Sequence, residues 1–235
     1  MNFILHIDTA LDQGSICLSA DGKLLEIINT QKQKEHASFI QPAISRLLKQ
    51  NNIDATYLSA ITVSAGPGSY TGLRVGMATA KGLCYALQIP LITIGTFELM
   101  TIAAAEALRK QNQLIAANDL FCPMIDARRQ EVYTALLNQH LQFIMEATTE
   151  IITENTLSGQ LNTCKIYFYG NGAAKFKSVC THPNAQFIDV SFDAANMINL
   201  SWEKFDKKEF ANLAYAEPFY GKEFYTGTKN KSHRL

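Results

Sequence analysis

The stretch SAGPGSYTGLRVG, which runs from Ser64 to Gly76, decides the fold of this 235-residue chain. An apolar run typical of a buried strand precedes it at Leu58–Ser64, and helical periodicity follows it to about Leu87. A glycine-rich turn from a strand into a helix presents backbone N–H groups that suit a phosphate. The stretch lacks the Gly-Lys-Ser/Thr ending of a P-loop, so a tight structural turn closed by Thr71 as helix cap is the alternative interpretation.

The first 111 residues show the pattern of a mixed sheet covered by helices. Asp21-Gly22 between two apolar runs is typical of a β-hairpin, and apolar residues at helical spacing indicate helices that pack on a sheet. The predicted strands are Phe3–Ile7, Gly14–Ala20, Leu24–Thr30, Leu58–Ser64 and Pro90–Ile94, and the predicted helices are Phe39–Leu48 with Ser38 as its cap, Thr71–Leu87 and Phe97–Leu108.

A shorter copy of this opening follows the polar segment 112–119. Phe121–Ile125 ends in Asp126 as Phe3–Ile7 ends in Asp8, and strand patterns continue the second meander. The sequence therefore predicts an α/β fold of two duplicated lobes, residues 1–111 and a smaller lobe at residues 112–220. We expect residues 221–235, which include four basic side chains, to form a mobile tail.

Composition narrows the function classes. The chain is 47% hydrophobic and carries 21 Lys and Arg against 21 Asp and Glu, so it can bury a large core and has no net charge. A neutral chain is not expected to hold nucleic acid mainly through its own phosphate contacts, although a partner can supply the charge. Five scattered cysteines without a CxxC motif indicate free thiols. Without a basic leader or a long apolar stretch, the chain is expected to be cytoplasmic and to make no membrane contact.

Two kinds of feature are candidates for function. In nucleotide-binding folds a carboxylate after the first strand holds magnesium or phosphate, but it also caps turns. Neither a catalytic residue nor a metal site is predicted, because no Ser/His/Asp motif or His/Cys cluster is present. The weak candidates for a phosphate or anion contact are Asp8, Gly66, Gly68, Ser69, Arg74, Asp126 and Arg128.

The second feature is a stripe of small residues, Gly72, Gly76 and Ala80, at four-residue steps in the second predicted helix. Each glycine inside a helix costs roughly 0.8–1 kcal/mol relative to alanine. A close approach by another backbone offsets that cost. The neighbour is either this chain's own sheet and first helix, or a helix pair of another subunit, and the sequence leaves both open.

Five segments together resemble the TsaB (YeaZ) family of bacterial proteins, which take part in making threonylcarbamoyladenosine in tRNA. The resemblance is dense from residue 3 to about 133. The paralogue TsaD, the catalytic subunit, carries a HxxxH metal pair, and the matching positions here are Thr96 and Met100, which cannot replace it. The segments are Ile7–Ala10, Glu35–Ser38, Ala65–Gly76, Ala78–Leu83 and Ile125–Arg129.

The resemblance implies an actin/Hsp70/sugar-kinase (ASKHA)-like fold with a trimmed second lobe and no activity or cofactor of its own. It implies a scaffold that docks on a TsaD-like subunit through helices at about Phe39–Gln50 and Thr71–Leu87, joined by a TsaE-like ATPase. ATP and a metal ion are then expected in those partners, tRNA contact is indirect, and a homodimer forms without TsaD. The implied interface residues are Phe39, Ala43, Leu47, Thr71, Gly72, Val75, Gly76, Thr79, Ala80 and Leu83.

One departure from the family and two rival functions remain. Gln130 stands where the family usually has glycine, which strains the hairpin if that position needs a positive φ. The rivals are an autonomous ASKHA-fold enzyme, either a small-molecule kinase or a peptidase, and a self-associating dimer without a role in tRNA modification.

Overall fold

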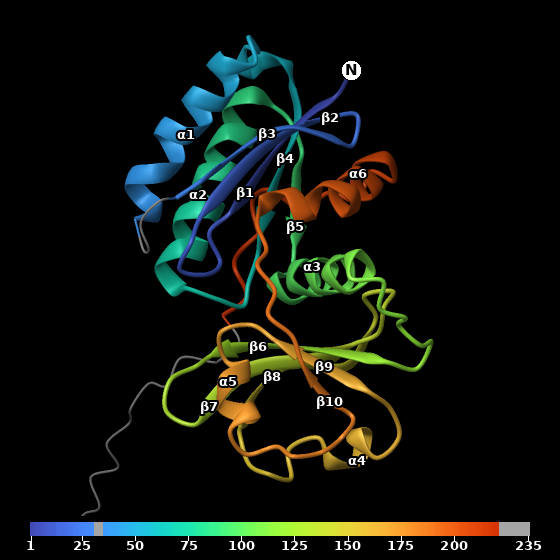
Figure 1. Cartoon of the computed structure of the whole chain (residues 1–235). Coiled ribbons are helices and arrows are strands. Elements are labelled where there is room, and N and C mark those ends of the chain that lie inside the picture. The colour runs from blue at the N-terminus through green and yellow to red at the C-terminus, as the bar shows by residue number, and fades with distance from the viewer. Residues whose placement is uncertain (31–34, 221–235) are drawn as a thin grey trace, which may run out of the picture.

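The apolar runs of the N-terminal half form one five-stranded sheet in the computed structural model, which describes residues 1–30 and 35–220 (Figure 1). The strand order is β3-β2-β1-β4-β5, antiparallel across the hairpins and parallel from β1 to β5. The central strand β1 is buried on both faces, which fits the apolar run Phe3–Leu5 and Ile7, and it also buries His6 and Asp8. The strands are β1 Phe3–Asp8, β2 Ser15–Ala20, β3 Lys23–Asn29, β4 Leu58–Ser64 and β5 Leu91–Ile94.

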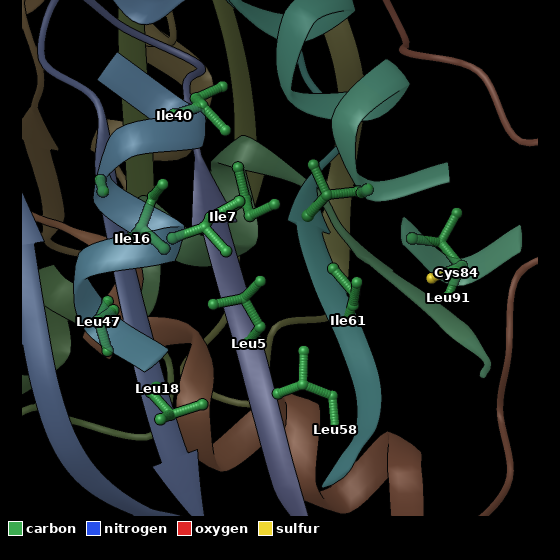
Figure 2. Close-up of a cluster of buried hydrophobic side chains, with 14 of the residues drawn as sticks. Leu5, Ile7, Ile16, Leu18, Ile40, Leu47, Leu58, Ile61, Cys84 and Leu91 are labelled. Carbon is green, nitrogen blue, oxygen red and sulfur yellow. The ribbon is translucent and has the colours of Figure 1, made fainter. Parts of the chain in front are cut away.

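Helices α1 (His36–Gln50) and α2 (Tyr70–Leu87) cover one face of this sheet, and the short helix η1 (Ala55–Tyr57) leads into β4. Ile40 and Leu47 of α1 pack on the strand residues in a single apolar cluster (Figure 2). Both predicted caps are wrong. The hydroxyl of Ser38 lies inside α1 and donates to the Glu35 carbonyl, and the N-cap of α2 is Ser69, whose Oγ accepts from Gly72 N.

The second sheet repeats the topology of the first, which confirms the duplicated α/β fold of the ASKHA type. Its order β10-β9-β6-β7-β8 places β6 where β1 stands, with an antiparallel meander on one side and parallel strands on the other. Two short helices, α4 (Ser158–Leu161) and α5 (Ala173–Lys177), stand where α1 and α2 have 15 and 18 residues, so this lobe is trimmed. The strands are β6 Leu120–Asp126, β7 Glu131–Leu137, β8 Phe143–Ile151, β9 Ile166–Tyr169 and β10 Ala185–Phe187.

The two lobes exchange helices. Helix α3 (Thr96–Lys110) follows β5 but packs on the second sheet, whereas η2 (Ala194–Met197) and α6 (Ile198–Asp206) follow the second sheet and pack on the first (Figure 1). Trp202 of α6 closes a cluster with residues from β1, β4 and β5. A division of the chain at residue 112 therefore separates the sheets but not the helices that cover them.

Residues 207–220, called here the C-terminal strap, run back along the first lobe. Ala211 pairs with Leu91 at the edge of β5, and the Nζ of Lys81 in α2 donates to the carbonyls of Ala214 and Ala216. The tail at residues 221–235 lies outside the described residues. Within them, no helix has the length and apolar character needed to cross a bilayer, and all five cysteines are free thiols.

The exchanged helix yields the first prediction. Replacing Trp202 by alanine removes the half-buried ring that covers the second face of the first sheet, and we expect the free energy of unfolding to fall by about 3 kcal/mol. Urea unfolding followed by circular dichroism measures the change. Tyr57→Ala, at a side chain that is 68% exposed, is the matched control and leaves the midpoint unchanged. An unchanged midpoint in Trp202→Ala would mean that α6 does not support the first sheet.

Candidate functional site

The glycine-rich turn crosses the end of β1 in direct backbone contact. Ser69 N donates to the Ala10 carbonyl at 2.6 Å, and the Thr9 hydroxyl donates to the Gly72 carbonyl at 2.8 Å. A Cβ added at Gly68 would lie 2.2 Å from the Ala10 oxygen, so only glycine fits there. The turn therefore uses its polar groups to bind the chain's own first strand.

The first glycine of the turn faces the C-terminal strap. Gly66 has φ +99°, and a Cβ there would lie 2.1 Å from the carbonyl oxygen of Phe219. Phe219 N donates to the Ala65 carbonyl at 2.8 Å, which fixes the end of the strap on the turn. Sequence reasoning missed this contact, because no signal links the turn to a segment some 150 residues later.

A cleft of about 540 Å³ lies between the two lobes at the start of α2. Four predicted anion contacts line this interlobe cleft: Gly68, Ser69, Asp126 and Arg128. Three do not. Asp8 and Gly66 are buried in the described structure, which corrects the prediction for these two, and Arg74 lies outside the cleft against Tyr70 and Tyr220.

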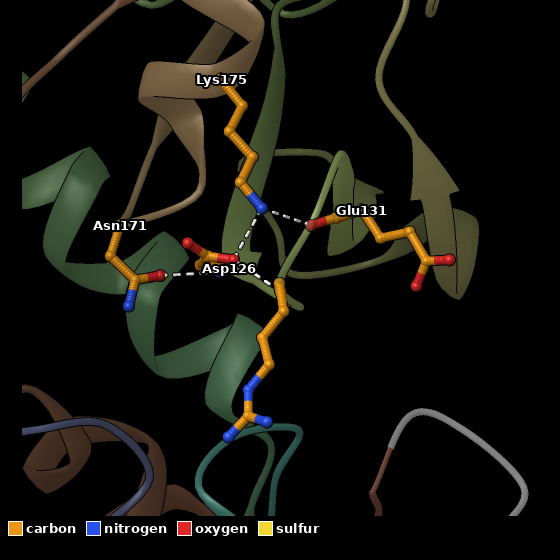
Figure 3. Close-up of polar contacts among 5 residues, drawn as sticks. Asp126, Glu131, Asn171 and Lys175 are labelled. Carbon is orange, nitrogen blue, oxygen red and sulfur yellow. Dashed lines mark hydrogen bonds and ion pairs between the residues drawn. The ribbon is translucent and has the colours of Figure 1, made fainter. Parts of the chain in front are cut away.

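The carboxylate of Asp126 lines the cleft and forms an ion pair with Lys175 (Figure 3). Its Oδ1 lies 2.6 Å from Lys175 Nζ and accepts the backbone N–H of Arg128, while its own N–H donates to Asn171. The hydrogen bond from Lys175 is the main cause of a lowered Asp126 pKa. The hairpin's positive φ values fall on Arg128 and Arg129, at 69° and 48°, so Gln130 is not where the strain of a missing glycine lies.

Two titratable side chains, His6 and Asp8, are buried on the same face of β1, where burial shifts both pKa values. Burial raises the pKa of Asp8 to about 6, although its Oδ1 accepts from Ala10 N at 3.1 Å. Burial lowers the pKa of His6 to about 3, and its ring nitrogens lie 2.8 Å from Ser19 Oγ and 3.2 Å from Ser201 Oγ. His6 thus joins β1 to β2 and to α6 as a neutral imidazole.

These shifts act on stability with opposite signs. Asp8 has its pKa raised on folding, so its ionisation costs stability above about pH 6, and that cost of about 3 kcal/mol disappears as the pH falls to 3.8. His6 has its pKa lowered on folding, so its contribution is complete above pH 6.5 and is lost as the pH falls toward 3. Between pH 6 and 4 the two contributions nearly cancel.

Single substitutions separate the two contributions. Asp8→Asn removes the gain in stability that protonation of Asp8 provides as the pH falls. We therefore expect the free energy of unfolding of this variant to fall by about 3 kcal/mol more than that of the wild type between pH 7 and pH 4. His6→Gln is expected to gain stability over the same range relative to its own value at pH 7. Urea titrations at four pH values measure both slopes, and parallel curves for all three proteins would contradict the assignment.

The positions that match the HxxxH pair of TsaD lie in the protein interior. Thr96 begins α3 and Met100 follows one turn later, and both are fully buried. Met100 packs with Phe97 and the strand residue Phe121 in the apolar cluster below α3. Among the residues that the structure describes, no group of three or more His, Cys, Asp or Glu side chains could hold a metal ion.

Comparison with known proteins agrees with this geometry. The model of the family described as TsaD, tRNA N6-adenosine threonylcarbamoyltransferase, matches residues 23–218. A TsaB protein of Haemophilus influenzae, named for tRNA threonylcarbamoyladenosine biosynthesis, is 28% identical and covers 92% of each chain. The chain belongs to this family, within its TsaB (YeaZ) group.

Two further relatives agree. The TsaB protein of Bacillus subtilis is 37% identical over 57% of this chain and 54% of its own. A crystal structure from Pseudomonas aeruginosa, described as a protein similar to the peptidase YeaZ, superposes with a TM-score of 0.78 and 22% identity. It covers 94% of this chain and 100% of that chain, and it shows the same fold.

The small-residue stripe of α2 faces the chain's own core. A Cβ at Gly72 would lie 2.2 Å from the Thr9 carbonyl oxygen, and one at Gly76 would lie 2.3 Å from the Thr9 hydroxyl, so the close approach is made within the chain. Direct partner contact is therefore wrong for the predicted interface residues that are buried in the described structure: Ala43, Leu47, Gly72, Gly76 and Ala80. Phe39, Thr71, Val75, Thr79 and Leu83 are exposed or half-buried, and their partner contacts stay predictions.

The opposite side of α2 holds another glycine, Gly82. Gly82 is exposed, and a Cβ there would meet no atom of the described residues within 4 Å. Gly76 and Gly82 of the same helix thus differ in environment: Thr9 leaves no room for a Cβ at Gly76, whereas the surroundings of Gly82 are open.

This contrast gives a paired prediction. Gly76→Ala is expected to destabilise the chain by about 1–3 kcal/mol, because the added methyl group overlaps the Thr9 hydroxyl. Gly82→Ala is expected to stabilise it by about 0.5–1 kcal/mol, because alanine favours the helix and nothing obstructs it. Urea unfolding measures both. The double variant Thr9→Ala/Gly76→Ala recovers part of the loss if Thr9 is the cause, and equal effects of the two single substitutions would contradict the distinction.

Proposed function

We propose that this chain is the noncatalytic subunit that binds a TsaD-like catalytic subunit, together with a TsaE-like ATPase, in threonylcarbamoylation of adenosine in tRNA. The names of its relatives support a role in tRNA threonylcarbamoyladenosine biosynthesis. The observation that carries the subunit role is the outer face of α2, where small residues stand without a reason inside the chain.

Gly82 is the centre of that face. A helical glycine costs roughly 0.8–1 kcal/mol relative to alanine, and among the residues that the structure describes no atom lies close enough to Gly82 to require it. Ala78 and Ala86 lie one turn to either side and are exposed, while Thr79 and Leu83 beside them are half-buried. A second helix can approach closely at Gly82 itself, and the exposed ring of Tyr85, one turn away, then borders the contact.

The charge of α2 favours a protein as the partner on this face. Its charged side chains are Arg74 and Lys81. Arg74 contacts Tyr70 and Tyr220, and Lys81 donates to the strap, so both are engaged at the strap side of the helix. Helix α1 lies beside α2 and adds the half-buried Phe39. A weakly charged face of small and apolar side chains is typical of the core of a protein interface.

The proposal assigns ATP and the metal ion to the partner subunits. The interlobe cleft of this chain is the one feature that favours the rival, an autonomous kinase or peptidase. Hydrolysis of ATP or of a peptide by the purified chain, lost in Asp126→Ala, whose side chain lines the cleft, would support that rival.

Two glycines with open surroundings allow a matched test of the interface. Gly82→Arg places a long charged side chain on the outer face of α2, and we expect it to reduce binding to the TsaD-like protein of the same cell at least tenfold. Gly159→Arg, in the short helix α4 of the second lobe, has the same open surroundings and is expected to bind as the wild type does. Calorimetry measures binding, and reconstituted modification of tRNA measures function.

Three outcomes would contradict the proposal. Wild-type binding by Gly82→Arg would remove α2 from the interface, and equal loss in both variants would show a non-specific effect. Equal modification of tRNA with and without the chain would contradict the subunit role. Size-exclusion chromatography with light scattering of the isolated chain tests whether the same substitution also breaks a homodimer.

A further inference from the structure

The C-terminal strap lies along the flank of α2 and is tied to the first lobe at three places. It pairs with the edge of β5 at Leu91, and Lys81 in the middle of α2 donates to two strap carbonyls at 3.2 and 2.9 Å. At its end, Phe219 is bonded to the glycine-rich turn, and the Tyr220 hydroxyl accepts from Arg74 Nε at 2.9 Å. The strap is therefore held as a bound peptide would be, by contacts spread along one side of a helix.

Little apolar surface keeps the strap in place. None of its residues, all of which the structure describes, is buried, and the side chains of Tyr215 and Phe219 are 83% and 50% exposed. Ala211, Leu213 and Ala216 are the strap residues that pack, partly buried, against the apolar cluster between α2 and the first sheet. A segment held mainly by hydrogen bonds near the surface detaches at a lower free energy than the core unfolds.

The turn that joins α6 to the strap is strained. Helix α6 ends in a Schellman motif, in which Glu209 N donates to the Lys204 carbonyl and Lys208 N donates to the Phe205 carbonyl. The motif holds Lys208 at φ +58°, in the left-handed region where glycine is the usual residue at this position. Opening the turn releases that strain, and a short strained hinge favours exchange of the segment that follows it.

The surface beneath the strap is matched to the strap itself. Gly66 leaves room for the Phe219 carbonyl, Lys81 reaches two strap carbonyls, and Leu91 offers its own carbonyl at the edge of β5. The strap of a second copy presents the same atoms in the same order, so it makes the same contacts without any new surface. When extended, residues 207–210 span about 13 Å, which carries the strap away from its own chain toward a neighbour.

We propose that the strap is exchanged between two copies of this chain, so that the strap of each copy lies along α2 of the other. In the exchanged dimer, Lys208 leaves the left-handed region while the strap keeps its contacts. The dimer forms on the side of α2 that carries Arg74 and Lys81, and it is distinct from a contact through the outer face at Gly82. It does not rest on the proposed function.

Cysteines on the two sides of one contact test the exchange directly. Ala65→Cys and Phe219→Cys are purified separately, mixed in equal amounts at millimolar concentration and oxidised. A backbone hydrogen bond of 2.8 Å joins the two positions, so exchanged straps bring the two thiols within reach of a disulfide. We expect a covalent dimer on a non-reducing gel from the mixture, and far less of it from either variant alone.

The hinge sets the equilibrium between monomer and dimer. Lys208→Gly adopts the closed turn without strain, and we expect the association constant measured by sedimentation equilibrium to fall about tenfold, since a dimer opens two hinges. Gln88→Gly is the matched control, because Gln88 ends α2 at φ 54° and lies outside the hinge. It is expected to leave the association constant unchanged.

The strap contacts set the rate of exchange. Lys81→Ala removes the same bonds from the monomer and from the dimer, so we expect the association constant to stay nearly unchanged and the exchange to become faster. Native mass spectrometry of mixed labelled and unlabelled dimers follows that rate. Thermal unfolding of every variant confirms that it is folded before the comparison.

Four results would overturn the proposal. They are a wild type that stays monomeric at millimolar concentration, no covalent dimer from the cysteine mixture, equal effects of Lys208→Gly and Gln88→Gly, and loss of the dimer in Gly82→Arg. The last result would show a dimer of the outer faces of α2 instead. The proposed function fails separately, when the wild type does not bind the TsaD-like protein or when Gly82→Arg binds it normally.

Discussion

The contact between the end of β1 and the start of α2 is the constraint on which the rest of the structure depends. Thr9 and Ala10 meet the backbone of the glycine-rich turn through hydrogen bonds of 2.8 and 2.6 Å, and no Cβ fits between them at Gly68, Gly72 or Gly76. This contact sets the position of α2 on the sheet. It also places the turn residues Ala65 and Gly66, on which the strap ends, and the first turn of α2, which lines the interlobe cleft.

The same contact accounts for polar groups of the glycine-rich turn that would otherwise be available to a phosphate. The polar groups of the turn are engaged by the chain itself, with Ser69 N bound to Ala10 and Ser69 Oγ bound to Gly72 N. The carboxylate of Asp8 accepts a hydrogen bond from the backbone N–H of Ala10, and Asp126 is paired with Lys175. Met100 fills its position with apolar packing. All of these groups therefore stabilise the fold of the chain itself.

The sequence predicted most of the fold because its strongest signals are local. The Asp21-Gly22 hairpin, the glycine-rich turn and the helical periodicity of α2 each lie within a few residues, and the second strand ending in an aspartate revealed the duplication. Periodicity shows which face of a helix carries the small residues, but it does not show which element packs against that face. The stripe at Gly72 and Gly76 was therefore assigned both to the core and to a partner. The strap and the exchange of α3 and α6 depend on contacts between residues far apart in the chain, which no local pattern encodes.

The exchange of helices has a consequence for how the chain is made. A ribosome releases the first sheet early, yet one face of β1, with His6 and Ile4, is covered by residues of α6 at positions 198–206. That face, which carries Ile4 and the neutral His6, is not covered by α6 until nearly the whole chain has emerged. The first lobe therefore cannot complete its packing until α6 has been synthesised, although the residues of its sheet come first.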